Sequence, residues 1–182
     1  MRAFLFLMLV LAGCGDDDVV PRTDAALPCE LRAATVEVRG PDRSYRALPA
    51  DAELVLGFQG FRYVYLRVST DGRPSSDETS ALVRLDSGEV VSQSFRVELV
   101  EDTPGHFVGT PQMLFFNDSP LPGLVDSVAD LTVRVGDARC NAEARGTFTV
   151  RYDPSCYEGP SGDRICPDGG APPSDAGTDG GP

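Results

Sequence analysis

The chain has 182 residues, of which 28 are acidic and 16 basic, and its formal net charge at pH 7 is -12. Clustered basic side chains bind phosphate backbones and anionic lipid surfaces, so this charge argues against both as partners. All the basic residues are arginines, which excludes a Schiff-base lysine, a P-loop lysine and a Ser-Lys dyad. The single histidine excludes a metal site built from several histidines. We therefore expect no nucleic-acid partner, no metal and no cofactor.

Residues 1–13 have the features of a secretory signal peptide. Arg2 supplies a short basic region, and the apolar run over residues 3–11 is well below the ~20 residues that a membrane-spanning helix needs. The segment Leu11-Ala12-Gly13-Cys14 resembles the lipobox of bacterial lipoproteins. The resemblance implies diacylglyceryl attachment to the Cys14 thiol and cleavage before that residue. The alternative is an ordinary signal peptide followed by a chance cysteine, because small residues at positions 12 and 13 also suit an ordinary signal peptidase.

Residues 14–27 are predicted to form a flexible tether. The segment is polar and short of aromatic residues, so it has little apolar surface to bury. In the sorting rule of enteric bacteria, an aspartate directly after the lipidated cysteine retains a lipoprotein in the inner membrane. This chain has Gly15 at that place. By resemblance, we expect a protein held in the outer membrane by its N-terminal lipid and facing the periplasm or the cell surface.

Residues 28–155 are predicted to form one β-sandwich domain, because apolar side chains recur there at every second residue. Turn residues such as Asp71-Gly72 and Thr103-Pro104-Gly105 separate the segments, and none shows a sustained helical repeat. Many short strands without helices favour an all-β fold, here an immunoglobulin-like antiparallel β-sandwich of about seven to nine strands. Strands are expected at residues 34–38, 53–56, 61–69, 81–85, 90–100, 112–116, 130–135 and 146–152.

The strand at residues 61–69 has two different faces. Aliphatic residues at positions 64, 66 and 68 alternate with Tyr63, Tyr65 and Arg67. An exposed aromatic row beside arginines is typical of a binding face, although a neighbouring loop could also cover such a row. The possible binding face consists of Arg62, Tyr63, Tyr65 and Arg67.

Two segments resemble uncharacterised lipoproteins of Gram-negative bacteria that have an immunoglobulin-like β-sandwich. The first is Leu56-Gly57-Phe58-Gln59-Gly60 and the strand after it, and the second is DLTVRVGDARCNAEARGTFTV over residues 130–150. The family has a second glycine and then a histidine where this chain has Phe61 and Tyr63. The resemblance implies the fold and the envelope location. It brings no known activity, and a role that depends on the missing histidine, such as metal binding, does not carry over.

An enzymatic function would depend on His106, the single histidine. His106 follows the turn at Pro104-Gly105, so we interpret it as an exposed turn residue, and no Gly-x-Ser-x-Gly segment is present. Acidic pairs at residues 77–78 and 101–102 lie in polar turn regions. We expect a monomer with a non-enzymatic binding or structural role, whose partner could be an envelope protein or a glycan. The alternative is an envelope hydrolase that uses His106 or acidic residues.

The other four cysteines are expected to form two disulfides. In immunoglobulin-like sandwiches part of the first strand often runs parallel to the last, so both strands start at one end. This arrangement predicts Cys29–Cys140 and leaves Cys156–Cys166 to close a small loop. An antiparallel arrangement would instead pair Cys29 with Cys156. Residues 156–182 are rich in glycine, proline and aspartate, and we expect them to be disordered apart from the local disulfide.

Overall fold

A computed structural model describes residues 29–57 and 59–166 of the chain. The predicted signal peptide, the Cys14 lipid site, the tether at residues 14–27 and the end of the tail at residues 167–182 lie outside the described residues.

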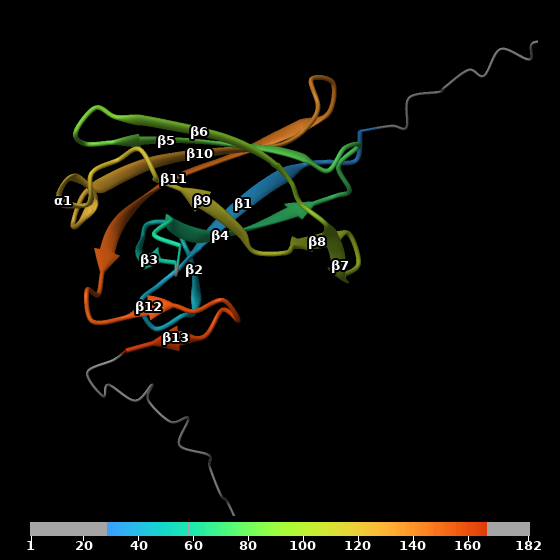
Figure 1. Cartoon of the computed structure of the whole chain (residues 1–182). Helices are drawn as coiled ribbons and strands as arrows, with labels where there is room; N and C mark the ends of the chain where they lie inside the picture. Colours follow the sequence, from blue (N-terminus) through green and yellow to red (C-terminus); the bar gives the residue numbers. More distant parts are fainter. Residues whose placement is uncertain (1–28, 58, 167–182) are drawn as a thin grey trace, which may run out of the picture.

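The regular secondary structure of the described residues is nearly all β-strand (Figure 1), which confirms the all-β prediction. One short helix, α1 (Leu121–Leu124), is present, and no helix of the described part has the length and hydropathy of a membrane span. The strands are β1 (Ala33–Arg39), β2 (Tyr45–Ala47), β3 (Ala50–Leu56), β4 (Arg62–Asp71), β5 (Glu78–Leu85), β6 (Val90–Arg96), β7 (Leu99–Thr103), β8 (His106–Gly109), β9 (Gln112–Phe115), β10 (Val128–Gly136), β11 (Asn141–Tyr152), β12 (Tyr157–Glu158) and β13 (Arg164–Ile165).

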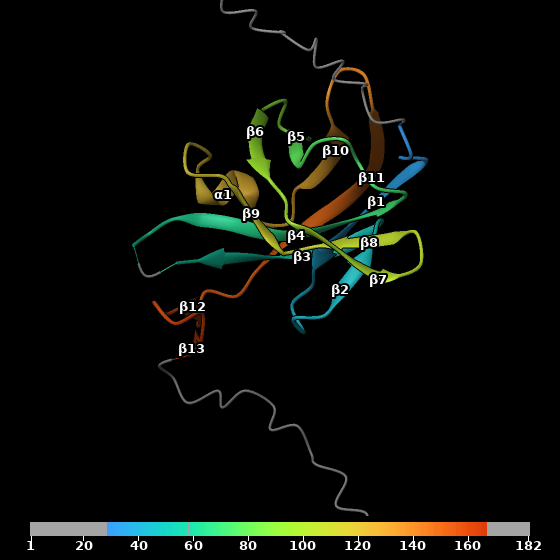
Figure 2. The ribbon, with the colours of Figure 1, turned by 90° about the vertical axis from the view of Figure 1, so that its right-hand side faces the viewer.

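The long strands form two packed sheets. In the first sheet β2, β1 and β4 are neighbours, β8 and β9 pair with the other edge of β4, and β7 pairs with β8. The second sheet has the order β6-β5-β10-β11-β3. The first eleven strands pair antiparallel throughout except for β3 and β11, which are parallel. Strand β3 also pairs with β4 at its end, so it belongs to both sheets. Figures 1 and 2 show β5, β6, β10 and β11 on one side of β4 and the β12–β13 hairpin on the other.

The core lies between the two sheets and follows the predicted alternation. In β5 every second residue is buried, and in β4 the aliphatic residues Val64, Leu66 and Val68 are almost fully buried. Among the fully buried side chains of the core, Phe148 of β11 and Phe116 after β9 are the largest. Fully burying such a side chain contributes about 1.5–3 kcal/mol, so this layer supplies most of the driving force for folding.

The predicted strand at residues 90–100 is in fact two strands in different sheets. Strand β6 pairs with β5, and β7 pairs with β8 after the chain has crossed between the sheets. Val97, in the crossing segment, is buried, and the side chains of residues 95 and 99 pack against the core. The period of two therefore continues through the crossing, which is why the sequence pattern does not reveal the break.

The predicted disulfide Cys29–Cys140 is confirmed, with 5.4 Å between its Cα atoms. The strand arrangement that brings the two cysteines together differs in one respect from the expected one. The strand that pairs parallel to β11 is β3 and not β1. Strand β1 is antiparallel to β4, and β4 is antiparallel to β3, so β1 still runs in the same direction as β11. The starts of β1 and β11 therefore lie at one end of the domain, where the disulfide joins them.

A glutamine side chain connects the two sheets at the β6 edge. Gln93 Nε2 donates a hydrogen bond to the Met113 carbonyl (2.9 Å), and Gln93 Oε1 accepts one from the Phe115 amide (3.1 Å). The side chain thus bonds the free edge of β9 as a neighbouring strand would.

We expect Gln93→Ala to lower the free energy of unfolding by about 1–3 kcal/mol, because it removes the hydrogen bonds that the Gln93 side chain makes with the Phe115 amide and the Met113 carbonyl. Ser92→Ala, on the neighbouring exposed position of β6, is the matched control and should change stability by less than about 0.5 kcal/mol. Urea denaturation measures both. Equal stabilities of the two variants would show that Gln93 does not hold the sheets together.

Candidate functional site

The outer face of the first sheet carries most of the predicted binding residues. It has two parts. Residues 156–166, which include β12 and β13, cover one part, and the other part is an open groove. We call residues 156–166 the C-terminal hairpin. The sandwich boundary expected at residue 155 is therefore followed by an ordered element that packs on the domain.

Tyr63 and Tyr65 lie beneath the C-terminal hairpin. Tyr63 is buried and Tyr65 is half-buried, and their rings meet edge to face with centroids 5.3 Å apart. Both hydroxyl groups donate hydrogen bonds to Glu158 Oε1, at 3.1 Å from Tyr63 and 2.6 Å from Tyr65. The Arg39 guanidinium lies over the Tyr65 ring, 3.9 Å from its centroid, in cation-π geometry. The hairpin thus covers the aromatic part of the predicted face.

The second oxygen of Glu158 is bound by arginines. Arg39 Nη2 lies 3.1 Å and Arg43 Nη2 lies 3.4 Å from Glu158 Oε2. Only 6% of Glu158 and 9% of Arg39 is exposed to solvent, so these charges are largely desolvated. A buried carboxylate is tolerated only when it is paired and hydrogen-bonded. We call Arg39, Arg43, Tyr63 and Tyr65 the Glu158 socket.

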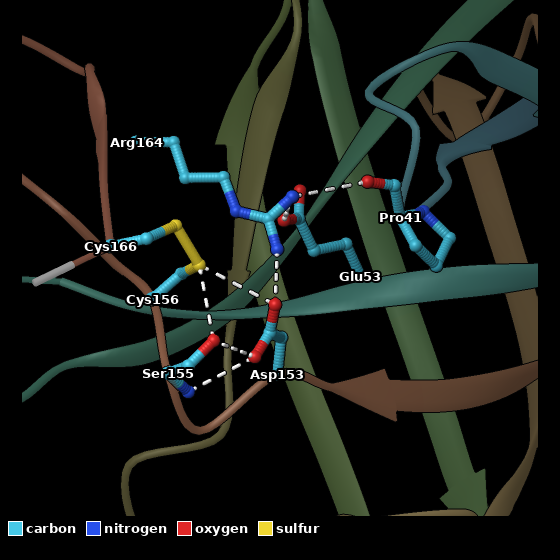
Figure 3. Close-up of a disulfide and its surroundings, with 7 residues drawn as sticks. All are labelled: Pro41, Glu53, Asp153, Ser155, Cys156, Arg164 and Cys166. Carbon is cyan, nitrogen blue, oxygen red and sulfur yellow. Dashed lines mark hydrogen bonds and ion pairs between the residues drawn. A yellow bond between two sulfur atoms is a disulfide. The ribbon is translucent and has the colours of Figure 1, made fainter. Parts of the chain in front are cut away.

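A second carboxylate, Glu53, lies beside the socket and points toward Arg164 of the hairpin (Figure 3). Its Oε2 is 3.2 Å from Arg39 Nη2, as an ion pair without hydrogen-bond geometry, and its Oε1 is 3.7 Å from Arg164 Nη1. Arg164 of the hairpin also contacts Asp153 at 2.7 Å. Arg39 therefore holds both buried carboxylates, one from β3 and one from the hairpin.

Burial affects these two carboxyl groups differently. Burial raises the pKa of Glu53, and the ion pairs with Arg39 and Arg164 and the nearby charge of Arg43 offset this rise only in part. For Glu158, burial also favours the neutral acid, but the hydrogen bonds from Tyr65 and Arg39 and the charge of Arg39 outweigh it, so its pKa is lowered. The site thus stabilises the ionised form of Glu158.

The predicted disulfide Cys156–Cys166 is confirmed, and it closes the hairpin. Strands β12 and β13 pair antiparallel inside this ring. Just before it, the Ser155 amide and hydroxyl donate to Asp153 Oδ1 at 3.0 and 2.6 Å (Figure 3). This turn directs the chain from the end of β11 back across the sheet.

The two predicted arginines lie apart from the socket. Arg62 Nη2 donates to the Asn117 carbonyl at 2.5 Å, beside the loop after β9. Arg67 lies in the open groove, where it makes an ion pair with Glu37 at 2.6 Å and its guanidinium lies 4.6 Å from the centroid of the Tyr45 ring. The structure therefore joins Tyr63 and Tyr65 in one site and places Arg62 and Arg67 elsewhere.

The open groove has a volume of about 500 Å³. One side of it carries the hairpin of β7 and β8, where His106 Nδ1 lies 2.5 Å from Asp102 Oδ1. The hydrogen bond that His106 Nδ1 donates to the Asp102 carboxylate raises the pKa of His106, which favours the imidazolium form. Ser69 is a diagonal cross-strand neighbour of His106, but no hydrogen bond joins His106 to a serine in the part of the chain that the structure describes. The lining includes Thr35, Glu37, Arg67, Ser69, Asp102 and His106.

Sequence reasoning missed the residues that organise the covered site. Arg39 is in phase with the outward residues of β1, but nothing in its neighbourhood predicts a buried ion pair. Glu158 lies in a segment rich in glycine and proline that has no periodic pattern. The chain matches no protein-family model, and no curated protein matches it. A functional assignment therefore rests on the geometry of the site.

The opposite pKa shifts predict opposite pH dependences for two variants. Because folding lowers the pKa of Glu158, its stabilising effect is present above the ordinary value of 4.5 and is lost as the pH falls through the folded value. The stability advantage of the native chain over Glu158→Gln should therefore shrink below pH 4.5.

For Glu53, folding raises the pKa, so its ionisation opposes folding above that value. The native chain should gain stability relative to Glu53→Gln as the pH falls from neutral toward 4.5. Chemical denaturation at a series of pH values measures both differences, with each variant serving as the control for the other. Parallel pH profiles of the two variants would contradict the opposite pKa shifts of Glu53 and Glu158.

Proposed function

We propose that this chain is a lipid-anchored protein of the cell envelope with a non-enzymatic binding or structural role. The observation that carries the proposal is the pair of disulfides in the described domain, Cys29–Cys140 and Cys156–Cys166. Structural disulfides persist in oxidising compartments outside the cytoplasm. The lipobox-like segment ending at Cys14 supports a lipid anchor, and Gly15 supports the outer membrane.

The outer face of the first sheet is the proposed interaction surface. The groove beside Arg67 is open, has charged side chains in its lining, and is large enough for a small ligand or a segment of a partner. Its charges form pairs, Glu37 with Arg67 and Asp102 with His106. A surface with both signs of charge close together suits a polar partner such as an envelope protein or a glycan. The domain is proposed to act as a monomer.

We expect Cys14→Ser to abolish membrane attachment, or to leave the protein unprocessed, because a serine hydroxyl does not replace the thiol that receives the lipid. Membrane flotation followed by mass spectrometry of the N-terminus measures this. Cys29→Ser, which removes a cysteine of the domain but not the predicted lipid site, is the control and should still float. A Cys14→Ser protein that floats with a correctly cut N-terminus would disprove the anchor.

A hydrolase is the second candidate, and one observation favours it. His106 is paired with Asp102, as in the orienting pair of a catalytic triad, and Ser69 lines the same groove. The geometry weighs against it, because Ser69 is buried and makes no hydrogen bond to His106 in the described residues.

A fluorophosphonate probe, which labels activated serines, distinguishes the two candidates. Under the binding proposal, the purified native chain should take up no more of the probe than its Ser69→Ala and His106→Ala variants do. If the native chain and Ser92→Ala are labelled but Ser69→Ala and His106→Ala are not, the chain is a hydrolase instead.

A further inference from the structure

The Glu158 socket has the composition of a carboxylate-binding site. Four side chains converge on one carboxylate: Arg39 and Arg43 on Oε2, and Tyr63 and Tyr65 on Oε1. All four come from β1, β4 and the turn after β1, whereas the carboxylate comes from the C-terminal hairpin. Receptor and occupant are therefore different parts of the chain.

The charge of the socket matches a monoanion. Without Glu158, the charged groups around the socket are the guanidinium groups of Arg39, Arg43 and Arg164 and the carboxylates of Glu53 and Asp153. These leave one positive charge, and the two tyrosine hydroxyls add neutral donors. A phosphate dianion would exceed this charge and lie close to Glu53. The site therefore favours a carboxylate over a phosphate.

Backbone geometry supports a peptide as the source of the carboxylate. Gly57, at the end of β3, forms an isolated parallel bridge with Glu158. Arg43 has a φ of 65°, a conformation that is uncommon for residues other than glycine, and its guanidinium also donates to the Gly162 carbonyl of the hairpin at 3.1 Å. Strained residues of this kind concentrate at binding sites. The socket thus recognises a main chain as well as a carboxylate.

The hairpin is held mainly by polar contacts. Its larger apolar side chains, Tyr157 and Ile165, are 36% and 37% exposed, and the core of the described residues ends at Tyr152. Under the hairpin lies a cavity of about 20 Å³, which has room for about one water molecule. The buried atoms Arg39 Nε and Glu53 Oε2 at this cavity make no hydrogen bond within the described structure. The hairpin can therefore separate from the sheet without opening the core.

We infer that the Glu158 socket is a binding site for a glutamate presented by an extended peptide, and that the chain's own C-terminal hairpin fills it as an internal competitor. The hairpin shields Tyr63 and Tyr65 until a peptide with the same chemistry displaces it. This inference does not depend on the lipid anchor, and a failed Cys14→Ser experiment would leave it unchanged.

The test is competition by the hairpin sequence itself. A fluorescein-labelled, disulfide-closed peptide of residues 155–166 is compared with the same peptide carrying Glu158→Gln. Fluorescence anisotropy measures the binding of each peptide to the purified full chain in detergent solution, as the native protein and as its Glu158→Gln variant.

We expect the Glu158→Gln protein to bind the glutamate peptide at least about tenfold more tightly than the glutamine peptide, because a charged carboxylate accepts stronger hydrogen bonds than a neutral amide does. The native protein should bind both peptides more weakly, because its own hairpin competes. Adding Tyr65→Phe to the variant should reduce the preference, whereas Tyr152→Phe should not.

Equal affinities of the two peptides for a folded Glu158→Gln protein would overturn the inference. If that variant does not fold, as judged by near-ultraviolet circular dichroism, the same comparison is made with Cys156→Ser/Cys166→Ser. This double variant keeps every socket residue and removes only the closure of the hairpin. A lack of preference for the glutamate peptide there would equally overturn the inference.

Discussion

The arrangement of the domain depends on the main-chain hydrogen bonds of β3. This strand pairs parallel with β11 in the second sheet and, at its last residues, antiparallel with β4 in the first. The two sheets are therefore joined through one continuous ladder in addition to the packing of their side chains. The same strand carries Glu53 on its outward side and Gly57 at its end. Its position thus sets both the relation of the sheets and the place where the C-terminal hairpin attaches.

Buried charges are an unusual way to attach a hairpin. Removing a carboxylate and a guanidinium from water costs several kcal/mol per ion, which their attraction offsets only when the remaining hydrogen bonds are also made. Glu158 meets this condition, because both of its oxygens have two donors. Glu53 does not, because one of its buried oxygens lacks a hydrogen bond in the described structure. The network therefore holds the hairpin through Glu158, whose charge is fully compensated, while Glu53 is compensated only in part.

The fold was largely predictable because the period of two is a direct effect of burying one face of each strand. The aliphatic residues of β4 and the alternation in β5 lie in the core as expected. The disulfide pairing was also predictable, since it needs only the direction of the strands. The covered site was not. Tyr63 and Tyr65 belong to the outward face, and they are bound there by Glu158, which is 93 residues from Tyr65 in the sequence and lies in a segment without pattern.

The disulfide Cys29–Cys140 also determines how the domain would respond to mechanical load. A tensile force applied at residue 29 passes through the covalent bond to the turn between β10 and β11. Without the bond, the same force would act on β1 and its hydrogen bonds to β2 and β4 alone. With the bond, the force acts along β11, a strand of 12 residues and so about 40 Å long. Its hydrogen bonds to β10 and β3 lie across the strand and are loaded together in shear. A load applied from the N-terminal side of the domain would therefore be carried by both sheets.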